Sequence, residues 1–109
     1  MDSTSGNFLP GTLEMLILKT LSRKPMHGYG IAETIRETSR DALKVGEGSL
    51  YPALQRLLLD ECVEAEWGLS ENNRRARIYT ITRAGRKHLQ QERLEFDQTI
   101  AGILRVMEA

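Results

Sequence analysis

The stretch EGSLYPALQRLL, residues 47–58, decides the fold, and its spacing predicts a helix with two different faces. The hydroxyl of Ser49 can accept an amide hydrogen of the first turn, which predicts a helix from Leu50 to about Asp60. Pro52 then falls in that first turn, where its missing N–H costs little. Residues placed about 100° apart bring the apolar side chains onto one face. This inner face consists of Leu50, Ala53, Leu54, Leu57 and Leu58.

The opposite face of this predicted helix carries Pro52, Gln55, Arg56 and Leu59, with Tyr51 at its edge. A tyrosine and a proline outside a buried helix are unusual in a segment that only packs, so we expect this face to touch a partner. Tyr51 is placed for a phosphate contact, and packing on a neighbouring hairpin is the alternative. Gln55 can bond adenine bidentately, and a solvated surface glutamine is the alternative. Leu59 is expected to be covered by the hairpin described below.

Two helices are predicted before this stretch. The first covers residues 9 or 10 to 22, because Pro10 suits a helix start. Its apolar residues lie on both sides, with Leu13, Leu16, Ile17 and Leu21 on one side and Met15 and Leu18 on the other. A helix that is apolar nearly all round is buried on two sides, and we expect the second side to meet another subunit. Residues 1–8 are expected to form a disordered tail without a signal peptide.

The second predicted helix begins at His27 or Gly28 and ends at Thr38. Gly28 and Gly30 flank Tyr29 in its first turn, although glycine weakens a helix, which indicates that another element approaches closely there. His27 and Tyr29 are expected to pack at the helix start. A contact between Tyr29 and a DNA backbone is the alternative.

A β-hairpin is predicted after the opening stretch. Val63, Ala65 and Trp67 alternate with two glutamates, a period of two that predicts a strand with one buried face. Residues 76–81 are β-branched and aromatic and predict a second strand, with Tyr79 and Ile81 on one face. The polar segment between the strands is expected to form a long tip.

One long helix is predicted to follow, capped by Thr82 and ending near Met107. Its apolar stripe consists of Leu89, Phe96, Ile100, Ile103, Leu104 and Met107. The spacing 96-100-103-107 alternates four and three, as in a coiled-coil seam. A helix of this size is about 37 Å long. Because a small domain cannot cover that length, we expect the helix to project and pair with a second copy.

The composition bounds the function. The chain has 109 residues, 40% of them hydrophobic, and a formal net charge of zero, so total charge neither favours nor excludes a polyanionic partner. Residues 60–71 carry acids and no Lys or Arg, whereas residues 72–91 carry bases and no acid. Such a local basic strip can bind phosphate. Cys62 is the only cysteine, which suits the cytoplasm, and no apolar run approaches a membrane span.

No chemistry of catalysis or metal binding stands out. The chain lacks a nucleophile paired with a base, a phosphate loop and a carboxylate pair. His27, Cys62 and His88 lack the close-spaced pairs of a zinc site, so neither a metal nor another cofactor is expected. Cys62 is expected to be a buried thiol, and a redox role is the alternative.

The predicted order of three helices, a hairpin and a long helix is that of a winged helix-turn-helix, a mainly α fold. In such folds the third helix enters the major groove and the hairpin lies along the DNA backbone. The residues expected to contact DNA are Tyr29, Lys44, Ser49, Tyr51, Pro52, Gln55, Arg56, Arg74, Arg75 and Arg77. For the three hairpin arginines, a solvated loop is the alternative.

The chain resembles the PadR family of bacterial transcriptional regulators. The resemblance runs along essentially the whole chain. It rests on four motifs in order, which are LPGTLEMLIL, HGYGIAETI, EGSLYPALQRL and RIYTITRAGRKHL. It implies a homodimeric repressor of the short type that binds a palindromic operator. It also implies release from DNA when a small aromatic or lipophilic effector binds.

The resemblance further implies that the first and last helices form the dimer. The expected interface consists of Leu13, Met15, Leu18, Leu89, Phe96, Ile100, Ile103, Leu104 and Met107. We therefore expect residues 9–82 to form the DNA-binding domain and residues 83–109 to form the dimerisation helix. The alternative is a protein-interaction adaptor on the same fold that binds no DNA, since a fold does not fix a function.

Overall fold

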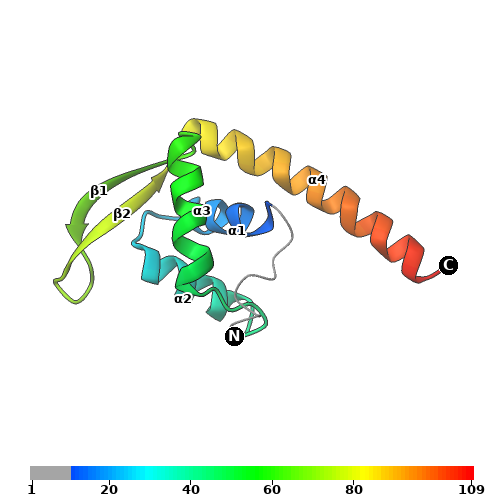
Figure 1. Ribbon diagram of the computed structural model, residues 1–109, viewed down its shortest axis with the longest axis horizontal. Helices are drawn as coiled ribbons and strands as arrows, with labels where there is room; N and C mark the ends of the chain where they lie inside the picture. Colours follow the sequence, from blue (N-terminus) through cyan, green and yellow to red (C-terminus); the bar gives the residue numbers. More distant parts are fainter. Residues whose placement is uncertain (1–10) are drawn as a thin grey trace.

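The computed structural model describes residues 11–109. The elements follow one another as α1 (Thr12–Leu21), α2 (Gly28–Thr38), α3 (Glu47–Leu59), β1 (Val63–Leu69), β2 (Arg75–Ile81) and α4 (Arg83–Met107) (Figure 1). The predicted order and the mainly helical class are confirmed, with β1 and β2 forming a two-stranded antiparallel sheet. The tail expected at residues 1–8 and the helix start expected at residue 9 or 10 lie outside the described residues.

The start of α3 differs from the prediction. The helix begins at Glu47 with Gly46 as its N-cap, and the amide of Ser49 donates to the carbonyl of Gly46 at 3.1 Å. Ser49 is therefore inside the first turn, and the predicted start at Leu50 is wrong. Pro52 lies in the second turn, where it cannot donate to the carbonyl of Gly48. Both residues are exposed, so water can reach the carbonyl left without a helix bond.

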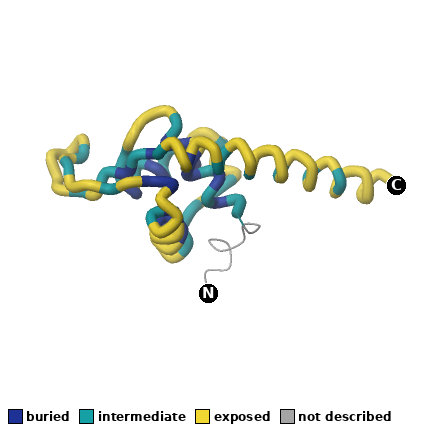
Figure 2. Tube along the Cα trace, turned by 90° about the horizontal axis from the view of Figure 1, so that it is seen from above, coloured by how far each residue is buried: buried dark blue, intermediate teal, exposed yellow. Residues whose placement is uncertain are grey.

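The core lies where α1, α2 and α3 meet the base of the hairpin. Figure 2 shows buried segments at the centre of the molecule and exposed ones along α4 and the far end of the hairpin. The core residues are Leu13, Ile17, Leu18, Leu21, Ile31, Ile35, Leu50, Ala53, Leu54, Leu57, Cys62, Val63, Tyr79 and Ile81.

The second apolar side of α1 is covered within the chain itself. Leu13 and Leu18 belong to the core, and Met15 is also buried. Met15 and Leu18 form the side that was expected to meet another subunit, and this expectation is wrong because both are buried without one. Leu13, also expected at the dimer interface, is likewise buried within the chain. The reason is that α1 is central and contacts α2, α3, β2 and α4.

The hairpin is fixed to the turn before α2. Its register runs from Val63 opposite Ile81 to Leu69 opposite Arg75. Met26 extends this ladder, because its amide donates to the carbonyl of Tyr79 at 3.2 Å and its carbonyl accepts from the amide of Tyr79 at 3.0 Å. The hairpin base is thus held by main-chain hydrogen bonds on two sides.

Two details of this region correct the sequence analysis. Arg75 lies within β2 and not in the tip, since the strand begins one residue earlier than predicted. Leu59 is 81% exposed, so the hairpin does not cover it. Leu59 is the last residue of α3 and points away from the core, whereas the hairpin packs through Val63, Tyr79 and Ile81.

The long helix α4 starts at a crowded junction. Thr82 accepts from the amide of Gly85 at 3.0 Å, which confirms the predicted cap, and its hydroxyl donates to the carbonyl of Glu61 at 2.7 Å. A Cβ on Gly85 would lie 2.1 Å from the carbonyl oxygen of Cys62, so glycine is required there. Beyond Leu89, which packs on the core, α4 projects away from the other helices (Figure 1).

Candidate nucleic-acid interface

The outer face of α3 is held at a fixed angle by the core. Leu50, Leu54 and Leu57 are almost completely buried. Tyr51, Pro52 and Gln55 are exposed on the other side, in agreement with the predicted faces. A short exposed face on a helix whose other side is fully packed suits docking in a groove, because the helix backbone needs little further ordering on binding.

Tyr51 explains one of the glycines of α2. A Cβ on Gly28 would lie 2.9 Å from the hydroxyl oxygen of Tyr51 and 3.1 Å from its ring, so the predicted close approach is confirmed at this position. The ring leans on the first turn of α2. Partial burial, followed by the charge of Glu47, raises the pKa of the Tyr51 phenol above 10.0. The hydroxyl therefore remains a hydrogen-bond donor at neutral pH.

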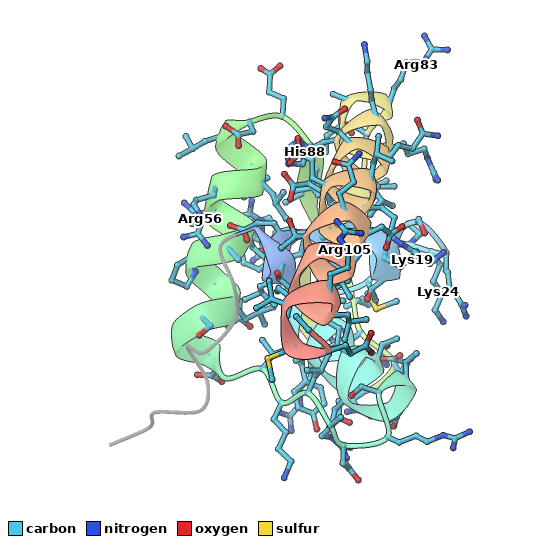
Figure 3. All side chains as sticks on the ribbon, turned by 90° about the vertical axis from the view of Figure 1, so that its right-hand side faces the viewer. Lys19, Lys24, Arg56, Arg83, His88 and Arg105 are labelled. Atoms are coloured by element: carbon cyan, nitrogen blue, oxygen red, sulfur yellow. The ribbon has the colours of Figure 1, made fainter. Side chains whose placement is uncertain are left out.

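Arg56 has a structural partner that sequence reasoning missed. Its Nε donates to Oε2 of Glu14 at 2.6 Å, and the Glu14 side chain is only 16% exposed. Arg56 itself is labelled on α3 in Figure 3. The pair connects α3 to α1. No local pattern could have revealed it, since the partners are 42 residues apart.

Tyr29 begins a chain of polar contacts along the outside of α2. Its hydroxyl donates to Oε2 of Glu33 at 2.8 Å. Arg36 donates to Oε1 of Glu33 at 2.6 Å and to Oδ1 of Asp41 at 2.7 Å. Tyr29, Glu33 and Tyr51 line an open cavity of about 310 Å³ that Lys44 also borders. Tyr29, Lys44 and Tyr51 are thus brought together between α2 and the start of α3.

The positions of the hairpin arginines follow from the alternation of side chains along β2. Arg74 is exposed in the tip, whereas Arg75 and Arg77 lie on β2. Their Cζ atoms lie 4.5 Å and 5.7 Å from the centroid of the Trp67 ring, close enough for cation–π contact. Arg77 is directly opposite Trp67 in the ladder. The stacking was not predicted from the sequence. The alternation in β1 could have indicated it, because it places Trp67 on a definite face of the hairpin.

The two faces of the hairpin differ in charge. Residues with odd numbers share one face, because every pair in the register joins two odd or two even positions. This face carries Trp67, Arg75 and Arg77. The even face carries Glu64 and Glu66, both exposed. The basic strip noted in the sequence therefore becomes a basic and aromatic face backed by an acidic one.

His27 connects the start of α2 to the hairpin tip. Its Nδ1 accepts from the amide of Gly30 at 3.0 Å, which makes it the N-cap and confirms the predicted role at the helix start. Because Nδ1 uses its lone pair in this way, Nε2 carries the hydrogen and donates to Oε1 of Glu71 at 3.2 Å. The pKa of Glu71 is lowered, first by its own backbone amide and then by His27. The hairpin is thus held at its base through Tyr79 and at its tip through Glu71.

Within residues 11–109, no group of three or more His, Cys, Asp and Glu side chains is placed to hold a metal ion. Burial, and then the charge of Asp60, raises the pKa of the Cys62 thiol. No helix in the same range has the combined length and apolarity to cross a membrane.

A three-helix core with a fixed outer helix face and a basic hairpin defines a winged helix-turn-helix protein. The sequence profile of the family described as "Transcriptional regulator PadR-like family" matches residues 17–91. The chain therefore belongs to the PadR-like family of transcriptional regulators. The family match confirms the resemblance stated from the four motifs, and it places the chain among regulators rather than enzymes.

Individual relatives agree with this assignment. A transcriptional regulator of Mycobacterium tuberculosis is 29% identical over 97 residues, which are 89% of this chain and 87% of that protein. A solved transcriptional regulator from Clostridium thermocellum superposes with a TM-score of 0.79 at 28% identity, covering 87% of this chain and 92% of the other. A PadR family transcription regulator from Clostridium difficile gives a TM-score of 0.72 at 26% identity, covering 91% and 100% of the two chains.

Proposed function

We propose that this regulator is a homodimer that binds a palindromic operator in double-stranded DNA, represses transcription, and is released by a small lipophilic or aromatic effector. The observation that carries DNA binding is the fixed, exposed outer face of α3 beside a hairpin with three arginines. Residues 72–91 contain no acid, so no carboxylate in this segment repels a phosphate backbone from Arg74, Arg75 and Arg77. A protein with this partner would work in the cytoplasm.

Specific roles follow from the positions of the side chains. Gln55 is proposed to contact base edges in the major groove, since it stands on the exposed face of α3. Ser49, Tyr51 and Pro52 are proposed to approach the backbone at the start of that helix, with Lys44 beside them. Tyr29 is proposed to contact the backbone from α2. Arg56 supports α3 through Glu14 and is also proposed to contact DNA from this exposed face.

The dimer is proposed to form through the projecting part of α4. Ile103, Leu104 and Met107 are exposed, and Phe96 and Ile100, half-buried, lie on the same stripe. Several large apolar side chains on one arm favour an interaction surface. Because this arm projects, residues 9–82 are proposed to form the DNA-binding domain and residues 83–109 the dimerisation helix.

The groove between α1 and α4 is the proposed place for the effector. It is an open groove of about 400 Å³, with an apolar wall of Met15, Leu16, Leu89 and Leu94 and with Lys19, Gln90, Arg93 and Asp97 as its polar residues. An apolar wall with few polar groups is typical of a small-molecule site. Met15 and Leu89, both expected at the dimer interface, would then contact the effector next to the second copy.

The test is a gel shift with the DNA upstream of the protein's own gene at low salt. A shift that competitor DNA does not remove supports operator binding. The Gln55→Ala variant should then change the preference among operator sequences, whereas Tyr51→Phe should weaken all duplexes alike. If preference is unchanged in Gln55→Ala, the base-reading assignment is wrong.

The adaptor remains the second candidate. It is favoured by the formal net charge of zero and by the acidic even face of the hairpin. The absence of any shift at low salt, with a folded protein, would favour this adaptor over the operator-binding regulator.

A further inference from the structure

We propose that Trp67 is a positioning residue that holds the guanidinium groups of Arg75 and Arg77 as a fixed pair for contact with DNA phosphates. The proposal rests on the DNA binding proposed above. Both guanidinium carbons lie within 6 Å of the ring centroid, at 4.5 Å and 5.7 Å. One ring thus serves two cations, and both lie on the odd face of the hairpin with it.

The register explains why this contact forms. Arg77 is the directly opposite partner of Trp67, and Arg75 is two residues further along the same strand face. Side chains that are opposite or diagonal across an antiparallel pair are within reach of one another when they are long or aromatic. The stacking is therefore set by strand geometry and needs no loop to be ordered.

The two charges are not neutralised by carboxylates. No ion pair between described residues involves Arg75 or Arg77. The nearest acids of the hairpin, Glu64 and Glu66, occupy its even face. The aromatic ring orders the guanidinium groups and leaves their N–H donors available for an anion, which a salt bridge would not do.

The hairpin that carries the ring is itself fixed. Tyr79 is hydrogen-bonded to Met26 through the main chain, and Glu71 accepts from His27. On the even face, the Ile78 side chain lies across Gly68, where a Cβ would be only 2.9 Å from Cγ1 of Ile78. The body of the protein therefore fixes the position of the ring, and the ring in turn fixes the two guanidinium groups.

The role of the ring in the core is small. Trp67 is 58% exposed and is not part of the core cluster, which ends at Val63 and Tyr79 in this region. Replacing the ring should therefore change the order of the arginines much more than the stability of the fold. Each immobilised flexible side chain affects binding measurably, so we expect loss of the ring to weaken DNA binding on the order of tenfold.

A double-mutant cycle tests the proposal. The four proteins are wild type, Trp67→Leu, the double variant Arg75→Ala with Arg77→Ala, and the triple variant. Affinity for the duplex upstream of the protein's own gene is measured by anisotropy of labelled DNA. We expect Trp67→Leu to bind about tenfold more weakly than wild type but to have no further effect when both arginines are absent. An equal loss in both backgrounds would show that Trp67 acts alone and would overturn the proposal.

The conservative variant provides a second criterion. Trp67→Phe retains an aromatic face, so it should bind within a few-fold of wild type, whereas Trp67→Leu should not. Equal affinities of Trp67→Leu and wild type, or equal losses in the two variants, would overturn the role of the ring as a cation platform. Urea midpoints of all variants are measured to show that the fold is intact.

The stacking can also be tested without DNA, which separates it from the proposed function. Trp67 is the only tryptophan, so intrinsic fluorescence reports this ring alone. Removing either arginine should shift its emission and increase quenching by acrylamide, a neutral quencher. If neither arginine variant changes the emission or the quenching, the platform is absent whether or not the protein binds DNA. If the stacking is present but wild type binds no duplex, the proposed function fails and the positioning role fails with it.

Discussion

The Nε–H group of Arg56 donates to Oε2 of Glu14 at 2.6 Å and so joins α3 to α1 across 42 residues of sequence. The bond matters because α3 carries the proposed base-reading face, and a helix that tilts would move that face relative to the groove. Glu14 is the more buried partner of the pair. Removing its charge leaves the Arg56 guanidinium without a carboxylate but still open to water.

Glu14→Gln should therefore destabilise the fold by about 1 kcal/mol, a value that allows for solvent screening of the half-exposed Arg56. Urea denaturation followed by circular dichroism measures the change. The matched control is Asp41→Asn, which removes a carboxylate from the exposed Arg36 pair at a position with φ of 66°, a conformation that asparagine tolerates. Equal effects of the two variants would contradict a special role for Glu14.

Gly85 should be the most sensitive glycine of the described chain. A Cβ there would lie 2.1 Å from the carbonyl oxygen of Cys62 and 2.8 Å from Cγ1 of Ile81, so backbone must move. We expect Gly85→Ala to cost about 3 kcal/mol or more.

Gly102→Ala is the control for this prediction, because a Cβ at Gly102 would meet only the end of the Arg105 side chain at 3.9 Å. Alanine at this position inside α4 should stabilise the helix by up to about 1 kcal/mol. Thermal unfolding of both variants measures the difference. If Gly85→Ala unfolds at the wild-type temperature, the packing of α4 on the Cys62 carbonyl is wrong.

The tip arginine should contribute to DNA binding through charge alone. Arg74→Ala should weaken binding to every duplex and reduce the slope of log K against log salt by about 1.8 for the proposed dimer on its full operator, because each of the two copies then neutralises one phosphate fewer. Arg105→Ala, on the projecting half of α4 (Figure 3), removes the same charge far from the hairpin and should leave affinity and slope unchanged. Identical behaviour of the two variants would count against the assignment of the hairpin as the wing.

Sequence patterns predicted these elements well where the physics is local. The alternation of Val63, Ala65 and Trp67 predicts a strand because side chains alternate by two, and Thr82 predicts a cap because its hydroxyl satisfies an amide three residues away. The start of α3 was missed because Ser49 and Gly46 are both acceptable caps. The choice between them depends on how the connector meets the body of the protein.

The remainder of the site depends on contacts between distant residues. The bond between Arg56 and Glu14, and the bond between His27 and Glu71, span 42 and 44 residues and leave no trace in local spacing. The exposure of Leu59 and the burial of Leu18 likewise depend on which elements pack against α3 and α1. The stacking on Trp67 lies between these cases, because register follows from the pairing of the strands once the length of the tip is known.

The polar chain on α2 should respond to acid. A hydrogen bond from Arg36, and then one from Tyr29, lowers the pKa of the Glu33 carboxyl below 4.5. The folded state therefore favours the carboxylate. The chain of polar groups supports folding above pH 4.5 and loses this effect as the pH falls through the lowered pKa. NMR titration of the carboxyl should show its pKa rising toward 4.5 in Tyr29→Phe and rising further in Arg36→Gln. A larger shift in Tyr29→Phe than in Arg36→Gln would contradict the order of these two hydrogen bonds.

The apolar stripe on α4 predicts that this helix forms the dimer interface. Phe96, Ile100 and Ile103 follow a spacing of four and three and share one side of the helix, so a carboxylate placed among them would be buried against a second copy. Ile103→Asp should convert the proposed dimer into a monomer in sedimentation experiments at micromolar concentration. Gln98→Asp adds the same charge on the opposite side of α4, where an exposed polar residue already stands, and should remain a dimer. A wild-type monomer would contradict the proposed dimer, and a dimer that survives Ile103→Asp would place the interface elsewhere. Because a palindrome is read by two symmetric copies, the monomeric variant should also lose most of its affinity for the full operator and bind a half-site as weakly as wild type does.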